Sequence, residues 1–258
     1  MNLKELQNKH KGQMAFVAGA GPSLRLVDPK LLKDYVVFTA NSAILKFPDC
    51  DYIVTDDEGV CTWNYWIHTV KNSKCTKLLY EKKLKDRVDH LRPEEVVLFD
   101  HRQWATPNNR GELVYHKENL KLTEDAEFPI IGSRSSQATA LHWAYIMGCD
   151  PIVLLGHDCC YEGRNRYFWQ FPGETRAIQY QGFVESNPNR GFIKNKPVDK
   201  HCVAYDLYWQ HFAEVNPDAT KGRIIYVSPT GILDVFPKRT LQEVLEQYKE
   251  RSKYEKQN

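Results

Sequence analysis

Short runs of apolar residues recur along the chain, and polar stretches long enough to hold a helix separate most of them. Continuous runs of this kind, rich in Val and Ile, are typical of strands that are buried on both faces of a parallel sheet. The pattern therefore predicts an α/β fold. The predicted strands cover residues 14–18, 35–40, 52–55, 76–80, 95–99, 151–155 and 223–227.

Helical periodicity is clearest in the second half of the chain. Residues 136–148 carry an apolar surface and end at Gly148, a residue suited to follow a helix. Residues 200–214 place aromatic side chains at helical spacing, and the last helix is predicted to begin at Thr240, with Glu243 completing a capping box. Strands and helices together predict a Rossmann-like, mostly parallel sheet with helices on both faces.

Residues 157–199 follow neither a helix nor a strand period, yet they hold eight aromatic residues and six Lys or Arg. A long irregular segment in a compact domain is usually a lid, a binding loop or a disordered segment, and the aromatic content argues against disorder. We therefore predict one nucleotide-binding α/β domain over residues 1–258 with a lid-like insertion at about 157–199. Residues 100–130 are also read as irregular.

Composition narrows the class of protein. The net charge of +2 over 258 residues argues against a nucleic-acid binder, and no apolar run approaches the length of a membrane span. The seven cysteines form no Cys-x-x-Cys pair, which indicates reduced thiols and a cytoplasmic protein. Nothing in the sequence points to an organic prosthetic group.

The strongest local motif, Gly19-Ala20-Gly21-Pro22-Ser23, directly follows the first predicted strand. Glycines let the backbone approach a ligand, Pro22 suits the first turn of a helix, and Ser23 adds a hydroxyl beside free N–H groups. The motif lacks the third glycine of the dinucleotide fingerprint and the Gly-Lys-Ser/Thr of a Walker loop. It predicts a phosphate site, and an ordinary strand-to-helix turn is the alternative.

Two further strand ends carry candidate ligands of a nucleotide. Asn41 follows the second strand, while Asp56 and Asp57 follow the third, beside Glu58. Adjacent carboxylates repel one another unless a cation lies among them, so Asp56 and Asp57 are candidate magnesium ligands together with substrate phosphates. The alternative is a solvated acidic turn.

Small hydroxyl residues and Arg134 stand before the helix at 136–148, where N–H groups can bind an anion. They are candidate nucleotide-binding residues, although plain N-capping explains a serine there equally well. The four residues are Ser133, Arg134, Ser135 and Ser136.

Gly156-His157-Asp158 ends the strand at 151–155, and His201 follows the irregular segment. A histidine can act as a general base near neutral pH, and Asp158 could hold a sugar hydroxyl or a metal. The candidate catalytic residues are His157, Asp158, His201 and, from the lid, Tyr167. A structural His–Asp pair and a surface histidine are the alternatives.

In combination and in this order, the motifs resemble the MptE-like family, which includes the archaeal 6-hydroxymethylpterin pyrophosphokinase and domains of bacterial motility accessory factors. The family commonly has Gln where His157 stands. The pyrophosphokinase uses magnesium, so the resemblance implies that Asp56 and Asp57 hold this ion. The matching segments are residues 16–24, 40–43, 51–56, 132–144 and 148–158.

A wider resemblance is to bacterial lipooligosaccharide-type sialyltransferases, which need no metal. They also pair a Gly-x-Gly-Pro-Ser-Leu loop with an Asn after the second strand, end a later strand in Gly-x-Asp, and use tyrosines and a histidine from a lid. The counterparts here are Asn41, Asp158, Tyr167 and His201.

Three hypotheses follow. The sequence favours a nucleotide-dependent glycosyltransferase that uses a sialyltransferase-like nucleotide-sugar and a small-molecule or glycan acceptor. The second is a pyrophosphokinase that transfers diphosphate from ATP, with magnesium, to a hydroxymethylpterin-like acceptor. The third is a non-catalytic nucleotide or sugar-phosphate binder. The aromatic lid favours an enzyme, because lids exclude water from a reacting centre.

Overall fold

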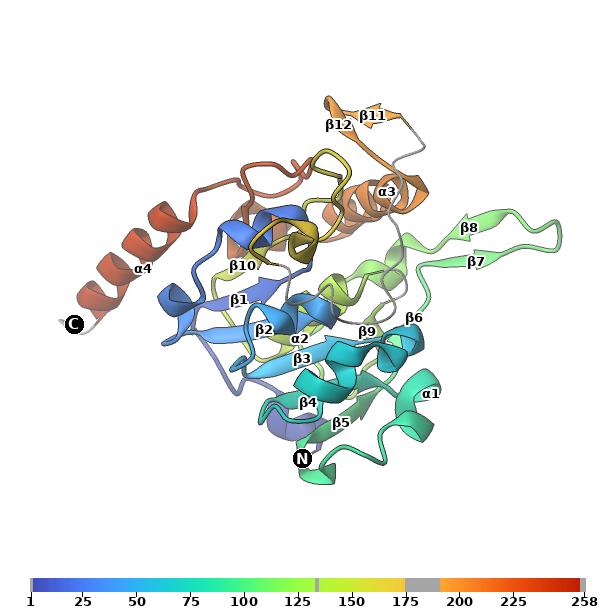
Figure 1. Cartoon of the computed structure of the whole chain (residues 1–258), viewed down its shortest axis with the longest axis horizontal. Coiled ribbons are helices and arrows are strands. Elements are labelled where there is room, and N and C mark those ends of the chain that lie inside the picture. Colours follow the sequence, from blue (N-terminus) through green and yellow to red (C-terminus); the bar gives the residue numbers. More distant parts are fainter. Residues whose placement is uncertain (1, 133–134, 175–190, 256–258) are drawn as a thin grey trace.

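The chain folds around one seven-stranded sheet in which every neighbouring pair of strands is parallel (Figure 1). The computed structural model describes residues 2–132, 135–174 and 191–255, apart from the side chains of 251–255. All seven predicted strands form. In sheet order they are β13 (Ile224–Val227), β10 (Ile152–Leu155), β1 (Ala15–Ala18), β2 (Val36–Ala40), β3 (Tyr52–Thr55), β4 (Thr76–Tyr80) and β5 (Val96–Phe99).

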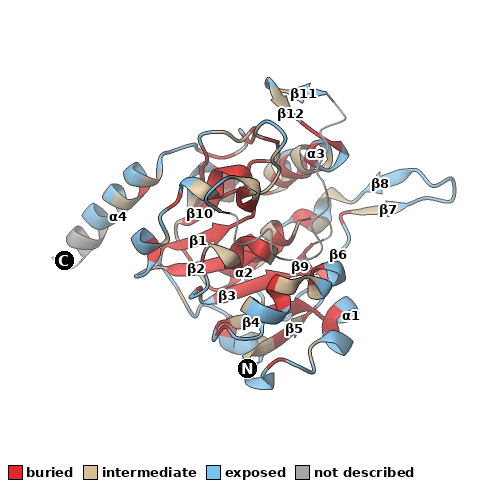
Figure 2. Cartoon of the chain, viewed as in Figure 1, coloured by how far each residue is buried: buried red, intermediate tan, exposed pale blue. Residues whose placement is uncertain are grey.

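Both faces of the sheet are buried, as the continuous apolar runs predicted (Figure 2). Alternate residues of each strand point to opposite faces, so Val17 joins one core and Phe16 the other. Two helices cover the first face, and the C-terminal helix packs on the second through Val244. The α/β prediction with helices on both faces is confirmed. These helices are α2 (Ser136–Ile146), α3 (Lys200–Val215) and α4 (Leu241–Glu255).

The connections between β1 and β4 contain single turns of 3-10 or π helix instead of long helices. Proline begins two of these turns, at Pro22 and Pro29. After β4 comes one turn of α-helix, α1 (Glu81–Leu84). β1 lies between β2 and β10, so the direction in which the chain adds strands to the sheet reverses at β1. Open parallel sheets bind ligands at the carboxyl ends of the strands beside such a point.

The segment read as irregular before α2 contains four short strands. β6 (His101–Arg102) pairs with β9 (Ile130–Ile131), while β7 (Ala105–Pro107) and β8 (Leu113–Tyr115) form a hairpin that projects from the molecule (Figure 1). The lid region adds a two-stranded ribbon of β11 (Phe192–Ile193) and β12 (Lys196–Pro197).

Side chains cap the first turns of α4 and α3, and the capping box predicted at Thr240 forms. Thr240 and Glu243 exchange the two hydrogen bonds of a capping box at the start of α4. Asp199 caps α3 by accepting from the N–H groups of His201 and Cys202. Across the described residues, no helix is long and apolar enough to cross a bilayer. The division of the chain into one domain stays a prediction.

Candidate active site

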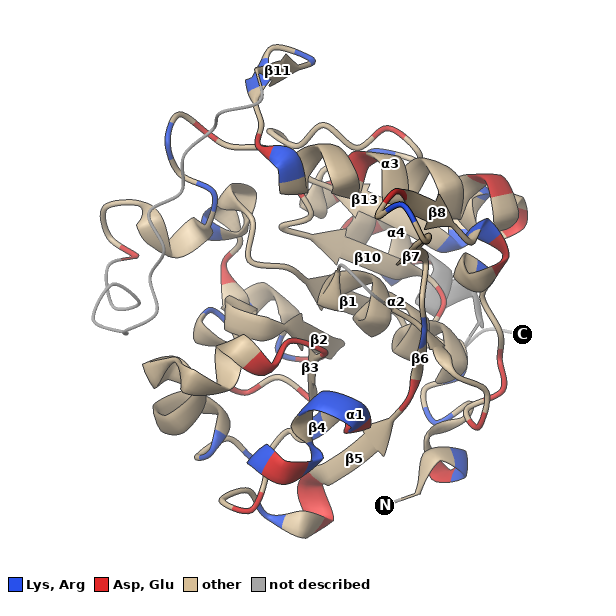
Figure 3. Cartoon of the chain, turned by 90° about the vertical axis from the view of Figure 1, so that its right-hand side faces the viewer, with Lys and Arg blue, Asp and Glu red and all other residues tan. Residues whose placement is uncertain are grey.

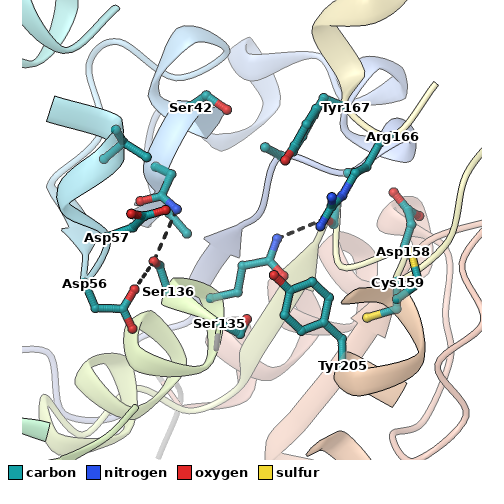
Figure 4. A pocket seen from close by; sticks show the side chains of 18 of the residues that line it. Ser42, Asp56, Asp57, Ser135, Ser136, Asp158, Cys159, Arg166, Tyr167 and Tyr205 are labelled. Atoms are coloured by element: carbon teal, nitrogen blue, oxygen red, sulfur yellow. Dashed lines mark hydrogen bonds between the residues drawn. The ribbon is translucent and has the colours of Figure 1, made fainter. Parts of the chain in front are cut away.

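A cavity of about 540 Å³ opens at the carboxyl ends of the strands, a size typical of small-ligand sites (Figure 4). Its wall is formed by the loops after β1, β2, β3 and β10, the start of α2, the lid region and α3. The chain therefore brings together Gly21, Asn41, Asp56 and Asp158, which the sequence places at four separate strand ends.

The glycine loop is bound tightly to the loop after β10. Gly21 N–H donates to the carbonyl of Gly156 at 2.9 Å, and Ser23 N–H donates to Oδ2 of Asp158 at 2.8 Å. A Cβ at Gly21 would lie 2.4 Å from the same carboxylate oxygen, and one at Gly19 would lie 2.8 Å from the Gly156 carbonyl oxygen. Only glycine allows this contact between the loops.

This arrangement corrects part of the predicted phosphate site. Gly21 lines the cavity, but Gly19, Pro22 and Ser23 do not, and Ser23 is buried. The N–H group of Ser23, expected to bind a ligand anion, binds the protein's own Asp158 instead. The glycine loop therefore shapes the cavity, while the N–H group of Ser23 is already bonded to the carboxylate of Asp158.

Asp158 is itself fully buried and holds three segments together. Besides Ser23, it accepts hydrogen bonds from the hydroxyls of Ser228 and, at 3.3 Å, Thr230. Burial raises the pKa of Asp158, and its hydrogen bonds oppose that rise. The carboxylate joins the cavity wall to the loop after β13, so its first role is to fix the site's geometry.

Asn41 begins a second network across the cavity floor. It has a positive φ of 51°, and its Nδ2 donates to Oγ of Ser136 at 3.2 Å. Ser136 in turn donates to Asp56, which also accepts from Oγ1 of Thr139. Among the described residues, Oδ1 of Asn41 is a buried acceptor without a protein donor. A ligand hydroxyl or amino group would satisfy it.

The two acidic residues have different surroundings. Asp56 is buried and bonded to α2, whereas Asp57 is exposed and Oδ1 accepts from Gly59 N–H at 2.9 Å. The described residues contain no group of three or more His, Cys, Asp or Glu placed to hold a metal. Magnesium commonly takes one carboxylate plus waters and substrate phosphates. Of the pair, therefore, Asp57 fits that ion and Asp56 fits a structural role.

The start of α2 faces the cavity as predicted. Ser135 and Ser136 line it, together with Gln137, whose Nε2 donates to the Gly156 carbonyl. Ser133 and Arg134 lie outside the described residues.

The opposite wall carries a cation framed by aromatic rings, and Figure 4 shows the three side chains together. Arg166 and Tyr167 come from the lid region, and Tyr205 comes from α3. Arg166 pairs with Asp199 at 3.2 Å. Although burial opposes its charge, Tyr167, Tyr205 and Asp199 raise the pKa of Arg166 above its usual range. The cavity therefore holds a permanent positive charge suited to a phosphate or carboxylate.

The first half of the lid region is fixed over the cavity. Arg25 makes two hydrogen bonds to Glu162, at 2.8 and 2.6 Å, and Lys46 pairs with Glu174 at 2.5 Å. Nε1 of Trp169 donates to Oγ of Ser42, and the Trp169 ring stacks on Tyr167. Contacts within the protein thus hold residues 157–174 against one side of the cavity.

The structure places both proposed histidine bases outside the cavity wall. His157 is only 1% exposed, its ring lies 5.8 Å from that of Trp209, and burial lowers its pKa to about 3. The extended strand ends before His157, at a left-handed turn where Gly156 has a φ of 64°, and the imidazole packs against Trp209 of α3 in the core. His201 is exposed on the first turn of α3, one turn before Tyr205. Tyr167 and Asp158 do line the cavity.

Sequence reasoning missed several residues of the wall, chiefly Lys83 of α1, His101 of β6 and Tyr205 of α3. Figure 3 shows the basic residues of α1 beside β4 and β5. His101 follows β5 closely, so the rule that located Asp56 and Asp158 at strand ends would also have found it. Tyr205 is one of the aromatic residues at helical spacing in 200–214, a pattern that predicts the helix but not a place in a site.

Comparison with known families gives one match over most of the chain. The model described as "6-hydroxymethylpterin diphosphokinase MptE-like" matches residues 1–164. The chain belongs to the MptE-like family. The matched region ends just after Asp158 and the start of the lid region, so it contains the glycine loop, Asn41 and Asp56. A search of curated proteins finds no match.

A solved glycosyltransferase structure shares the fold. The MAf glycosyltransferase from Magnetospirillum magneticum AMB-1 superposes with a TM-score of 0.56 and 12% identity over 93% of this chain. The match covers 37% of that protein, so this chain corresponds to little more than a third of its length. The sialyltransferase CstII from Campylobacter jejuni, in complex with CMP-3FNeuAc, gives a TM-score of 0.45 and 15% identity over 88% of this chain and 86% of that one. The family description and the first structure both name transferases.

Proposed function

We propose that this chain is a transferase, and specifically a cytoplasmic glycosyltransferase that uses a nucleotide-sugar donor. The observation that carries the proposal is the composition of the cavity wall. One side offers the amide oxygen Oδ1 of Asn41, which has no protein donor among the described residues, and the other offers Arg166 between two tyrosines. Such a wall can bind a nucleoside on one side and neutralise its phosphate on the other.

The roles follow from the contacts. The unsatisfied Oδ1 of Asn41 would accept from a ribose hydroxyl or a base amino group. Arg166 would neutralise the phosphate that becomes the leaving group, and Asp199 keeps its guanidinium in place. Tyr167 and Tyr205 would pack against the sugar and exclude water. The similarity in fold to the MAf glycosyltransferase supports this choice among transferases.

A second candidate is diphosphate transfer from ATP, favoured by the family description. There Asp57 would hold magnesium, which would neutralise charge on the transferred phosphates. Since Asp56 is buried and bonded to Ser136 and Thr139, Asp57 is the carboxylate of the pair that would serve this reaction.

A thermal-shift panel separates the two. CMP, CDP, UDP, GDP, ATP and 6-hydroxymethylpterin are each added with and without Mg²⁺. A ligand at 100 times its dissociation constant stabilises the fold by about 2.7 kcal/mol. We expect a pyrimidine or guanine nucleotide to raise the melting temperature, and Asp57→Ala to leave that rise unchanged. A rise with ATP that needs both Mg²⁺ and Asp57 would establish the diphosphotransferase instead. No rise with any nucleotide would contradict both.

Arg166→Ala should weaken nucleotide binding by about 10-fold to 100-fold, because it removes a charged hydrogen bond worth roughly 1.5–3 kcal/mol. Titration calorimetry with the nucleotide selected by the panel measures the change. Arg164→Ala is the matched control, since Arg164 is exposed in the same lid segment and does not line the cavity. Equal affinities for the two variants would remove Arg166 from the phosphate site.

A further inference from the structure

His101 is a histidine of the cavity wall that the proposed function leaves without a role. It stands in β6, just after β5, and its side chain lines the cavity while only 8% of the residue is exposed. By contrast, His157 lies in the core and His201 lies on the outer surface of α3. His101 is therefore positioned to exchange a proton with a bound molecule.

Three neighbours surround its ring. The Tyr80 ring lies against it with centroids 3.7 Å apart and an interplanar angle of 31°. Just after β9, the strand that pairs with β6, a Cβ built at Gly132 would lie only 2.5 Å from Cγ of His101. Nε2 of Gln103, another cavity residue, lies 3.5 Å from Nδ1. The imidazole thus has a fixed orientation, which proton transfer requires.

The charges around His101 suit a base. Burial lowers its pKa below the ordinary value of 6.5, so the ring is neutral at pH 7. Asp56 and Asp100 act in the opposite direction, and Lys83 of α1 adds to the lowering. Once the ring has taken a proton, the Asp56 carboxylate stabilises the imidazolium. Asp56 is itself held by Ser136 and Thr139, so it remains in position for this task.

We propose that His101 is the general base of the glycosyl transfer and that Asp56 is its electrostatic partner. The acceptor oxygen forms a bond to the anomeric carbon while the bond from that carbon to the phosphate oxygen breaks. The electron pair of the broken bond leaves with the nucleotide phosphate, and the acceptor's proton passes to the imidazole. This inference rests on the proposed function, and it gives the acidic end of β3 a role that needs no metal.

The test compares His101→Gln with the wild type and with His116→Gln. His116 is a half-buried histidine that bonds Oγ1 of Thr106 and does not line the cavity. CMP-sialic acid, UDP-glucose and GDP-mannose are the donors, water is the acceptor, and the released nucleotide is measured. We expect turnover by His101→Gln to fall about 10²-fold to 10⁴-fold, with the thermal shift from the free nucleotide preserved. His116→Gln should match the wild type.

Two further readouts distinguish a base from a residue that only supports the wall. Wild-type turnover should fall as the pH drops through the pKa of His101, below 6.5, and His101→Gln should lack this acidic limb. Gly132→Ala, which must displace the ring, should reduce turnover while nucleotide binding persists.

The outcomes separate the inference from the function beneath it. If a donor is turned over and His101→Gln retains more than a tenth of the rate, or keeps the acidic limb, His101 is not the base and the glycosyltransferase proposal stands. If no nucleotide binds and the wild type releases no nucleotide from any donor, the proposed function fails, and the inference fails with it.

Discussion

Replacing Asp158 with alanine is expected to lower the free energy of unfolding by about 3–5 kcal/mol, as when one partner of a buried charged network is removed. The substitution leaves the N–H of Ser23 and the hydroxyls of Ser228 and Thr230 buried without their acceptor. An unsatisfied buried donor costs about 1–3 kcal/mol. Urea unfolding followed by fluorescence measures the change.

Two variants control this result. Asp158→Asn keeps the shape and one acceptor oxygen, so it should recover part of the loss. Asp234→Ala removes an exposed carboxylate paired with Lys194, and such a change usually alters stability by less than about 0.5 kcal/mol. Similar losses for Asp158→Ala and Asp234→Ala would show that the network does not stabilise the fold.

Gly21→Ala is expected to destabilise the fold by about 1–3 kcal/mol, the usual cost of overpacking, and to abolish the nucleotide-induced thermal shift. The new Cβ would lie 2.4 Å from Oδ2 of Asp158 and 2.6 Å from the Gly156 carbonyl oxygen. Neither atom is the end of a flexible side chain free to turn away, because the first is hydrogen-bonded and the second is backbone. The loop must therefore move out of place at the cavity wall.

Gly222→Ala is the matched control for this effect. Gly222 does not line the cavity, and a Cβ there meets no heavy atom within 4 Å. Neither glycine has a positive φ that alanine would strain, so the two variants differ in steric contact. Gly222→Ala should be neutral or stabilising by up to about 1 kcal/mol. If both variants were equally stable and bound nucleotide alike, the close contact between the two loops would have no functional weight.

The sequence by itself determined the sheet, because strands that are buried on both faces are apolar at most positions. The apolar runs 14–18 and 151–155 show the pattern clearly, and both form strands inside the sheet, β1 and β10. It also indicated the family, through motifs that follow one another in a recognisable order along the chain. The sequence also predicts that the residues after the strands lie together, since parallel strands end on one edge of the sheet. The cavity wall contains four of them: Gly21, Asn41, Asp56 and Asp158.

Only the tertiary structure decided what each of these groups does. A loop N–H is an anion site by local rules, yet Ser23 donates to Asp158, which is 135 positions away in the chain. An Asp-Asp pair is typical of a metal site, yet Asp56 accepts a hydrogen bond from Ser136 of α2, which is distant from it in the sequence. His157 directly follows a predicted strand, yet the turn at Gly156 and the packing against Trp209 bury it in the core, whereas His101 reaches the cavity from a segment without a clear period. Local sequence patterns indicate which backbone groups at the ends of strands and helices could bind a partner, and which faces of these elements are apolar. Which charge meets which partner depends on contacts between distant segments, and these exist only after the chain has folded.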